Sequence, residues 1–311
     1  MRMTARSATR PFRFGVQKMG FEDPAELTSF AQRVEALGYD ELYSYDHFGA
    51  DDPFAPLMVA ALATERLRVG ALVINNEFHH PALLARTAAS VDRMIGGRLV
   101  LGLGTGYDQA EHDSIGLTLR PPKQRVDRFG ESLIVLRSLL DDGTCEIDGE
   151  HHHVAVTELE SRPAQAHVPF LIGGHGRRVV ALGGRYADIF QFTGLTHAEG
   201  GKPGPGGFAL EQVIERSRRL TEAAGDRDDQ IERSTLVQFA AVGSEAPSSD
   251  EVSSRFGLDA HAIDSTPFVL IGSVEQIVDK LEQLRQLIGI SHVVVRDPDG
   301  FAPIVDQLRG R

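Results

Sequence analysis

The chain has 311 residues, of which 41% are hydrophobic and 24% charged, and its formal net charge is −12. This length is enough to bury a large core and is typical of a (β/α)8 barrel. The acidic balance argues against a sequence-independent nucleic-acid surface, because neutralising phosphates requires a basic patch. No apolar stretch reaches the roughly 18 to 20 residues of a membrane span, and the amino terminus lacks the apolar core of a signal peptide. We therefore expect a cytoplasmic protein that binds neither nucleic acid nor a membrane.

The first half of the chain alternates between short apolar segments and segments with helical spacing. The helical segment 24–37 ends at Gly38, which is typical of a helix C-cap. The segment 81–95 opens with a proline and closes at two glycines, as helices often do. The predicted strands of this half are 12–17, 41–45, 67–74 and 98–104, and the predicted helices are 24–37, 56–64, 81–95 and 123–140.

The second half continues the alternation less regularly. A long polar segment, 143–165, is compatible with a hairpin around Asp148 and Gly149, and the Gly- and Pro-rich segment 194–207 predicts a mobile loop. The predicted strands here are 169–172, 187–192, 234–242 and 291–296, and the predicted helices are 178–186, 210–224 and 274–287. Eight strands alternating with helices predict a parallel TIM barrel with insertions in the loops after strands four and six. We interpret residues 1–10 as a flexible leader and 11–311 as a single barrel domain.

The most informative segment is 97–106, Gly-Arg-Leu-Val-Leu-Gly-Leu-Gly-Thr-Gly. Its apolar run, 99–103, is typical of a strand buried on both faces, as in a parallel sheet covered by helices. The glycines just past this run let backbone amides approach a ligand without an intervening side chain. A tight connection between strand and helix, with no ligand, would produce the same pattern. The segment by itself leaves both interpretations open.

Polar residues follow four of the predicted strands where these end. In a parallel barrel the ligand site lies at the carboxyl ends of the strands. The four turns read Ser-Tyr-Asp-His (44–47), Val-Ile-Asn-Asn (73–76), Gly-Thr-Gly-Tyr (104–107) and Gly-Gly-His-Gly (173–176). The last turn is followed by the densest cationic cluster, Arg177, Arg178 and Arg185, which favours an anion site. The sequence thus predicts one face that carries two glycine-rich turns and an Asp-His pair.

These motifs resemble the bacterial luciferase-like monooxygenase superfamily, and within it the deazaflavin branch that uses coenzyme F420. The resemblance is carried by residues 12–15, 45–47, 69–73, 80–86, 92–106, Glu111, 169–174 and 185–188. It covers nearly the whole chain after the first ten residues and is weakest between 194 and 268. It implies a TIM-barrel oxidoreductase that transfers a hydride between a deazaflavin and a small organic substrate. An FMNH2-dependent monooxygenase and a catalytically silent flavin-binding protein are the alternatives.

The resemblance also implies which residues hold the cofactor. In relatives a non-proline cis peptide supports the ring, and here that bond would join Leu72 and Val73. Asn75 would then meet the ring edge. The further residues implied in cofactor binding are Asp46, Thr105, Gly106, Gly174, His175, Gly176, Arg177 and Arg178. The two arginines would meet the phosphate or the anionic oligoglutamyl tail of F420, and Lys202 adds positive charge in the Gly-rich loop.

Hydride transfer leaves a developing negative charge on the substrate, so a nearby proton donor assists it. His47 is the candidate, because histidine can supply a proton near neutral pH. Asp46 would contact the cofactor or orient the imidazole, although the Asp-His pair could instead merely cap a strand. Tyr107 and Glu111 are second candidates for proton donation or for polarising a substrate carbonyl. Tyr107 also departs from the sugar-phosphate dehydrogenase branch, where a glutamate follows Gly-Thr-Gly, so oxidation of a sugar phosphate is not expected.

Two further interpretations concern the surface. We interpret the predicted helices 81–95 and 123–140 as carrying an exposed apolar seam, and the resemblance implies a homodimer through comparable helices. The charged residues Asp40, Glu41 and 66–68, as well as the histidines 151–153, are interpreted as ordinary solvated side chains.

Overall fold

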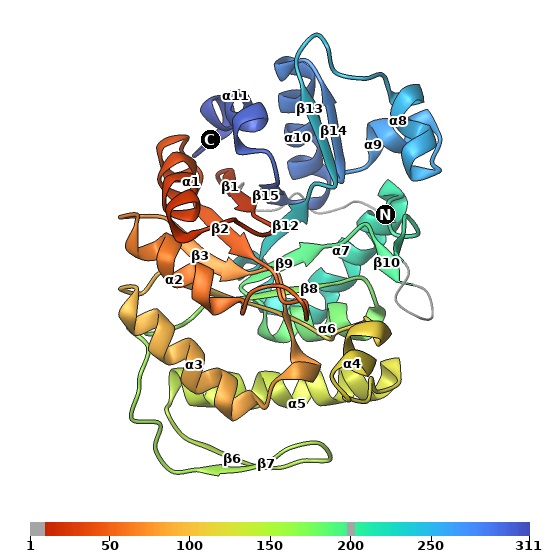
Figure 1. Ribbon diagram of the computed structural model, residues 1–311. Helices are drawn as coiled ribbons and strands as arrows, with labels where there is room; N and C mark the ends of the chain where they lie inside the picture. Colours follow the sequence, from red (N-terminus) through yellow and green to blue (C-terminus); the bar gives the residue numbers. More distant parts are fainter. Residues whose placement is uncertain (1–9, 198–202) are drawn as a thin grey trace.

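A computed structural model describes residues 10–197 and 203–311 of the chain. Parallel strands close into a ring, because β3 pairs with β2 on one side and with β5 on the other (Figure 1). The barrel strands are β1 (Arg13–Gln17), β2 (Glu41–Ser44), β3 (Arg68–Ala71) continued by β4 (Ile74–Asn75), β5 (Leu99–Gly104), β8 (Phe170–Gly174), β9 (Ile189–Phe192), β12 (Glu232–Leu236) and β15 (Ile290–Val295). The predicted TIM barrel is confirmed.

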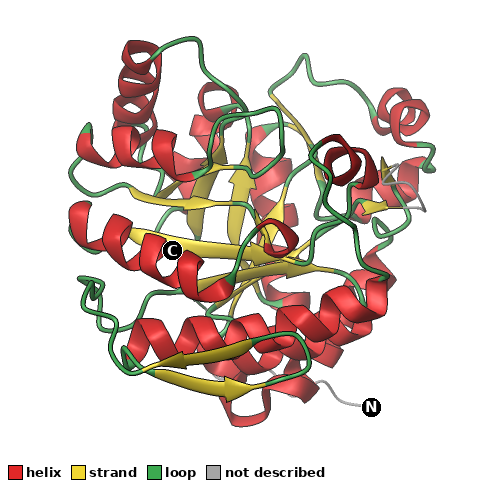
Figure 2. Ribbon diagram, turned by 60° about the horizontal axis from the view of Figure 1, so that its bottom comes forward, coloured by secondary structure: helices red, strands yellow, loops and turns green. Residues whose placement is uncertain are grey.

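Helices surround the ring of strands (Figure 2). They are α1 (Pro24–Ala36), α2 (Phe54–Leu62), α3 (Pro81–Met94), α5 (Pro122–Asp141), α6 (Arg177–Tyr186), α7 (Leu210–Ala224), α10 (Val274–Ile288) and α11 (Pro298–Leu308). Local chemistry sets their ends: Asp23 accepts hydrogen bonds from the first backbone N–H groups of α1, and Ser273 forms a capping box at the start of α10. In the part of the chain that the structure describes, no helix is long and apolar enough to cross a membrane.

The two predicted insertions are present. After the fourth barrel strand come α4 (Gln109–Ser114) and, beyond α5, the antiparallel hairpin of β6 (Cys145–Asp148) and β7 (His153–Val156), seen at the bottom of Figure 1. The predicted hairpin around residues 148 and 149 is therefore confirmed. After the sixth strand, β10 (Thr196–His197) pairs with β11 (Pro203–Gly204). Part of the predicted mobile loop, including Lys202, lies outside the described residues.

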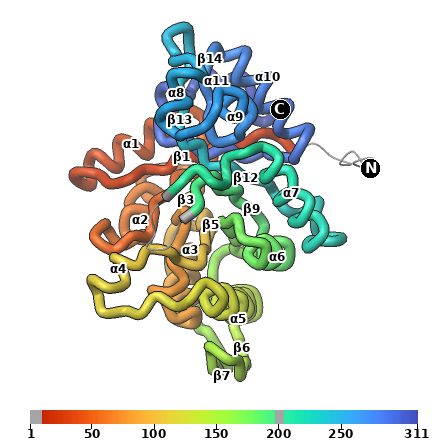
Figure 3. The backbone as a smooth tube through the Cα atoms, turned by 90° about the vertical axis from the view of Figure 1, so that its right-hand side faces the viewer, coloured from red at the N-terminus to blue at the C-terminus, as the bar shows by residue number. Residues whose placement is uncertain are grey.

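A third insertion was not predicted. The predicted strand 234–242 is two strands, because the chain leaves the barrel after β12 and continues as β13 (Phe239–Val242). β13 pairs in parallel with β14 (Val269–Gly272) in a separate two-stranded sheet, and α8 (Ser249–Phe256) and α9 (Ala260–Ser265) lie beside it (Figure 3). The backbone N–H of Val237 still bonds to β15, whereas that of Gln238 bonds to Phe268 ahead of β14. The sequence has the same apolar character on both sides of this change of partner strand, so it does not reveal where the predicted strand divides into β12 and β13.

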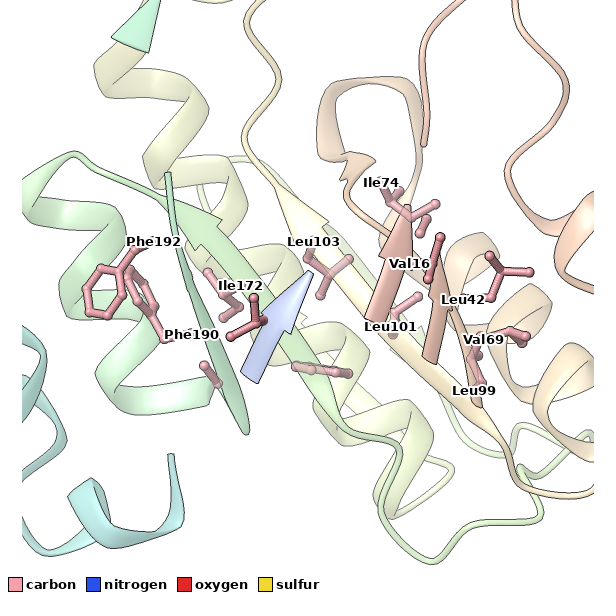
Figure 4. Packing of buried hydrophobic residues seen from close by; sticks show 14 of the residues in the cluster. Val16, Leu42, Val69, Ile74, Leu99, Leu101, Leu103, Ile172, Phe190 and Phe192 are labelled. Atoms are coloured by element: carbon pink, nitrogen blue, oxygen red, sulfur yellow. The ribbon is translucent and has the colours of Figure 1, made fainter. Parts of the chain in front are cut away.

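The barrel strands are buried on both faces, as the apolar run in 97–106 predicts. Every residue of β5 is buried, and its side chains alternate between two environments. Leu99, Leu101 and Leu103 belong to the large cluster between strands and helices (Figure 4), whereas Val100 belongs to a smaller cluster inside the barrel. The inner cluster also contains Tyr43, Leu72, Leu171, Ile189 and Val294.

The interior at the amino ends of the strands is ionic rather than apolar. Glu41 is fully buried and forms an ion pair with Arg13, and its Oε2 lies 3.3 Å from Nε2 of His292, which is itself fully buried. Arg13 also pairs with Glu232 at 2.9 Å. The interpretation of Glu41 as a solvated charge is therefore wrong. A glutamate at the first position of an apolar strand resembles a surface residue in sequence, and only barrel closure turns it inward.

Candidate functional site

The peptide bond between Leu72 and Val73 is cis, as the resemblance implies. It lies between β3 and β4, near the carboxyl ends of the barrel strands, a face called the barrel mouth below. Gln17 at the end of β1 donates a hydrogen bond from Nε2 to the Leu72 carbonyl at 3.0 Å. Val73 packs close to β5, since a Cβ at Gly104 would lie 2.5 Å from its Cγ2. Glycine at position 104 is thus required by this close approach.

Asp46 and Asn75 form a hydrogen-bonded turn beside the cis peptide. Asp46 Oδ2 accepts from the backbone N–H of Asn75 at 2.8 Å and contacts His79 Nε2 at 3.1 Å. Asn75 is buried, and its side chain accepts from the Glu77 N–H at 3.0 Å. Gly106, with φ of +70°, lies against it, because a Cβ at Gly106 would overlap the Asn75 amide. The structure therefore brings the third and fourth strand ends together as predicted.

His47 is held by Glu111 rather than by Asp46. Its Nδ1 lies 2.6 Å from Glu111 Oε1, and the Tyr107 hydroxyl lies 3.4 Å from its Nε2. The other Glu111 oxygen accepts from the backbone N–H of Phe48 at 3.3 Å. Since a carboxylate can only accept, the contact favours a proton on Nδ1 and leaves Nε2 as the nitrogen that can exchange one. Two roles were considered for Asp46, contacting the cofactor and orienting the His47 imidazole. Its contacts do not support the second role, because Asp46 contacts His79 and Asn75 instead.

Tyr107 remains protonated near neutral pH. Burial, with the nearby charges of Glu111 and Asp108, raises the pKa of Tyr107 to about 12. Its hydroxyl can therefore donate a hydrogen bond but does not act as a base under ordinary conditions. His47 keeps 35% of its side chain exposed, against 17% for Glu111, so the imidazole is the part of this group that a ligand can reach.

The second glycine turn leads into the amino terminus of α6. Gly174 ends β8, and Gly176 caps α6 without any side-chain hydrogen bond. A Cβ at Gly176 would meet nothing within 4 Å. No side chain therefore caps the amino terminus of α6 or fills the space beside Gly176, an arrangement that suits an anion. The adjoining pocket, of about 370 Å³, is lined by His175, Thr196, Gly206, Gly207, Glu211, Gln212, Glu215, Arg216 and Arg219.

The basic side chains around this turn differ in whether they could contact a bound anion. Partial burial lowers the pKa of His175, and the charge of Arg216 adds to this, so His175 tends toward the neutral form. Arg177 is exposed at the start of α6. Arg178 instead forms an ion pair with Asp127 on α5 and donates to the Lys123 carbonyl at 3.3 Å. The two arginines, which the sequence does not distinguish, therefore point to different surroundings.

Three polar residues inside the mouth were missed in the sequence. Gln17, described above, is one. Gln191 Nε2 and Thr193 Oγ1, at the end of β9, are buried and have no hydrogen-bond partner among the described residues. The Gln191 Oε1 accepts from Ser234. For two of them the sequence contained a usable signal, because Gln17 and Gln191 are polar residues at inward positions of otherwise apolar strands.

One other pocket lies away from this face. A second pocket, of about 330 Å³, is lined by Arg13, Glu35, Tyr39, Asp40, Arg66, Arg68 and Arg309, and lies at the amino ends of the strands. Within residues 10–197 and 203–311, no group of three or more His, Cys, Asp or Glu side chains is arranged to hold a metal ion.

The protein is a closed parallel barrel of the TIM type, and proteins of this class have their ligand site at the carboxyl ends of the strands. The cis peptide, the two glycine turns and the His47–Glu111 pair all lie at that end of this barrel. Residues 7–263 match the family described as luciferase-like monooxygenase. The chain belongs to this family, whose members are oxidoreductases.

Two curated relatives are similar to the chain. One is the 5,10-methylenetetrahydromethanopterin reductase of Methanopyrus kandleri, 24% identical, with 92% of this chain and 93% of the relative covered. The other is the F420-dependent glucose-6-phosphate dehydrogenase of Nakamurella multipartita, 29% identical over 74% of this chain and 67% of the relative.

Two solved structures share the fold. The coenzyme F420 dependent tetrahydromethanopterin reductase of Methanopyrus kandleri matches with a TM-score of 0.74 at 19% identity, covering 96% of this chain and 98% of that one. The oxygenating constituent of 3,6-diketocamphane monooxygenase of Pseudomonas putida, solved with FMN, matches with a TM-score of 0.72 at 15% identity and the same coverage. At these identities the likeness shows the fold alone.

Proposed function

We propose that this protein is an F420-dependent oxidoreductase that transfers a hydride between the deazaflavin and a small organic substrate. The observation that carries the proposal is the His47–Glu111 pair, with Tyr107 beside it, on the same barrel mouth as the Leu72–Val73 cis peptide. The curated dehydrogenase named above, which is F420-dependent by name, supports the choice of cofactor.

The residues at the mouth fit a cofactor of this kind. Leu72, Val73, Asn75, Thr105 and Gly106 lie at the ends of the third and fourth barrel strands and would hold the ring. Gly174, His175, Gly176 and Arg177 would hold the phosphate and the start of the anionic tail. Two observations support the fit: the open space over Gly176, and the buried polar atoms of Gln191 and Thr193 that lack partners among the described residues. When bound, a reduced deazaflavin supplies the hydride.

The chain's own contribution is to manage a proton. Glu111 accepts a hydrogen bond from His47 Nδ1, which orients the ring and leaves Nε2 to exchange a proton. Nε2 can then deliver its proton to the substrate atom on which negative charge develops, or recover one in the reverse direction. Tyr107, protonated because of its raised pKa, donates a hydrogen bond to Nε2 or to a substrate oxygen.

An FMNH2-dependent monooxygenase is the second candidate, because the FMN-bound structure named above has a TM-score of 0.72, close to the 0.74 of the F420-dependent one. FMN ends at a monophosphate, whereas F420 continues into an anionic tail. The two therefore differ in the positive charge that they need beyond the phosphate. Arg177, exposed at the start of α6, favours the longer cofactor, while Arg178 is already paired with Asp127.

A paired titration with F420 and FMN tests the proposal. Each cofactor is fluorescent, and its anisotropy rises on binding even though this chain has no tryptophan to report on it. We expect F420 to bind at least tenfold more tightly than FMN. Tight FMN binding without F420 binding would favour the monooxygenase. If neither cofactor binds, the assignment of a flavin-type site is wrong.

A further inference from the structure

The last barrel strand places an arginine at the mouth. β15 ends at Val295, and side chains alternate along it, so Arg296 follows Val294 on the side that faces the barrel interior. Its contacts agree with this position. Nε donates to Gln17 Oε1 at 3.2 Å, and Nη1 donates to Gln238 Oε1 at 3.4 Å.

Gln17 connects this arginine to the cis peptide. Its side chain is buried, its Oε1 accepts from Arg296, and its Nε2 donates to the Leu72 carbonyl at 3.0 Å. One amide therefore bridges the guanidinium and the backbone that the proposed cofactor ring would lie against. The guanidinium is therefore held by hydrogen bonds beside this backbone, while the exposed part of the Arg296 side chain can be reached by a ligand.

Arg296 has no counter-ion in the part of the chain that the structure describes. Both of its contacts are neutral amides. The neighbouring cation Lys18 differs, since it pairs with Glu26 at 2.9 Å. Asp297, the next residue along, uses its carboxylate to cap α11. Neighbouring protein lowers the pKa of Arg296 by removing part of its water, yet a guanidinium stays charged in proteins.

We propose that the substrate carries a carboxylate, which Arg296 binds at the barrel mouth. The planar guanidinium fork matches a carboxylate, and a partly desolvated cation without a counter-ion favours an anionic partner. Gln17 and Gln238 are positioning residues, because they hold the fork through its Nε and Nη1. The inference rests on the proposed function for what happens to the substrate, but binding of the carboxylate can be measured without F420.

The test is calorimetric titration with two matched pairs, benzoate against benzamide and acetate against acetamide, with and without F420. We expect the wild-type protein to bind at least one carboxylate about tenfold more tightly than its amide. Arg296→Gln should abolish that preference by weakening carboxylate binding alone. Arg296→Lys, which keeps the charge but not the fork, should retain part of it. Melting temperature and F420 affinity of each variant report whether folding and the cofactor site are intact.

The matched control is Arg66→Gln, which removes one positive charge from an exposed side chain at the other end of the barrel. It should keep the full preference. The inference is overturned if the wild-type protein shows no preference in either pair, or if Arg296→Gln keeps it. A preference that depends on Arg296 in a protein that does not bind F420 would instead leave the carboxylate site standing and remove the proposed cofactor.

Discussion

A single hydrogen bond, from His47 Nδ1 to Glu111, leaves Nε2 as the imidazole nitrogen that can exchange a proton. Glu111 lies on α4, in the insertion after the fourth strand, and reaches back to the turn after the second. Tyr107 completes the group from the end of the fourth strand. Proton delivery in the proposed reaction therefore depends on side chains from two separate strand ends.

Replacement of His47 tests this role. In His47→Ala we expect single-turnover hydride transfer to slow by about 10²-fold or more, because the proton donor is lost. F420 affinity should stay within about twofold, since the imidazole is not assigned to the cofactor. Stopped-flow absorbance of F420 measures the first quantity and anisotropy the second. Tyr107→Phe, which keeps the ring but removes the hydroxyl, should have a smaller effect. Unchanged transfer in His47→Ala would remove His47 from catalysis.

At the scale of elements, the amino terminus of α6 and the hairpin of β6 and β7 show how short segments are fixed. The α6 terminus is left open by a glycine cap without a side chain. The hairpin is bound to α5, because Glu131 accepts the backbone N–H groups of Glu150, His151 and His152 at 2.9 Å each. The amino terminus of α6 therefore has no side-chain hydrogen bond at its cap, whereas the hairpin is tied to α5.

Gly176→Ala should separate binding from folding. Its φ of −69° suits alanine and the added methyl meets nothing within 4 Å, so stability should fall by less than about 1 kcal/mol. The methyl would occupy the space proposed for the phosphate, and cofactor affinity should drop about tenfold. Thermal melting and the anisotropy titration measure the two effects. Gly130→Ala on α5, whose Cβ would make only ordinary contacts, is the control. Equal cofactor affinity in both variants would contradict the proposed phosphate site at Gly176.

The hairpin predicts a pH dependence of stability. His152 is buried, with Nε2 at 3.0 Å from Ser132 Oγ, and burial, helped by the charges of Arg128 and His80, lowers the pKa of His152 to about 4. Between this value and the ordinary pKa of about 6.5, the unfolded chain binds more protons than the folded one. Stability is therefore lost as the pH falls through this window, by about 2 kcal/mol at about pH 5.

Urea unfolding at about pH 7.5 and about pH 5 measures this loss. His152→Gln should reduce the difference between the two pH values, whereas His153→Gln, at an exposed position, should not. An unaltered pH dependence in His152→Gln would show that other groups cause the acid destabilisation.

At the scale of the whole molecule, the outer surface bears on assembly. α3 packs beside α5 and exposes Leu83 and Met94, with 54% and 59% of each residue accessible, and α5 exposes Ile134. We propose that this seam joins two copies of the chain, in agreement with the homodimer contact expected from the sequence. It faces away from the barrel interior, so assembly need not cover the mouth.

Light scattering after size exclusion should then give twice the 33.9 kDa of one chain. Charges placed on the seam by Leu83→Glu and Met94→Glu together should shift the protein to monomers, because like charges would be buried against each other. Leu287→Glu on α10, also at an exposed apolar position, should leave the assembly unchanged. A monomeric wild-type protein, or a double variant that still dimerises, would refute the proposed interface.

The sequence by itself determined the barrel and the position of its mouth. Alternating strands and helices, the apolar run 99–103 and the glycine turns are local patterns, and burial and backbone conformation follow from such patterns directly. The cis bond at Leu72 and Val73 was reached through resemblance alone. The role of each site residue remains a prediction.

The tertiary structure alone decided which side chains became partners. His47 pairs with Glu111 and not with its neighbour Asp46, Arg178 turns to α5, and Glu41 is buried at the amino ends of the strands. Nor does any local pattern reveal that the chain leaves the barrel after β12, or that Gln17 links Arg296 to the cis peptide. The physical reason is common to all of these. Each contact joins residues distant in the chain, and it forms only when barrel closure brings together their strands, or the helices packed around those strands.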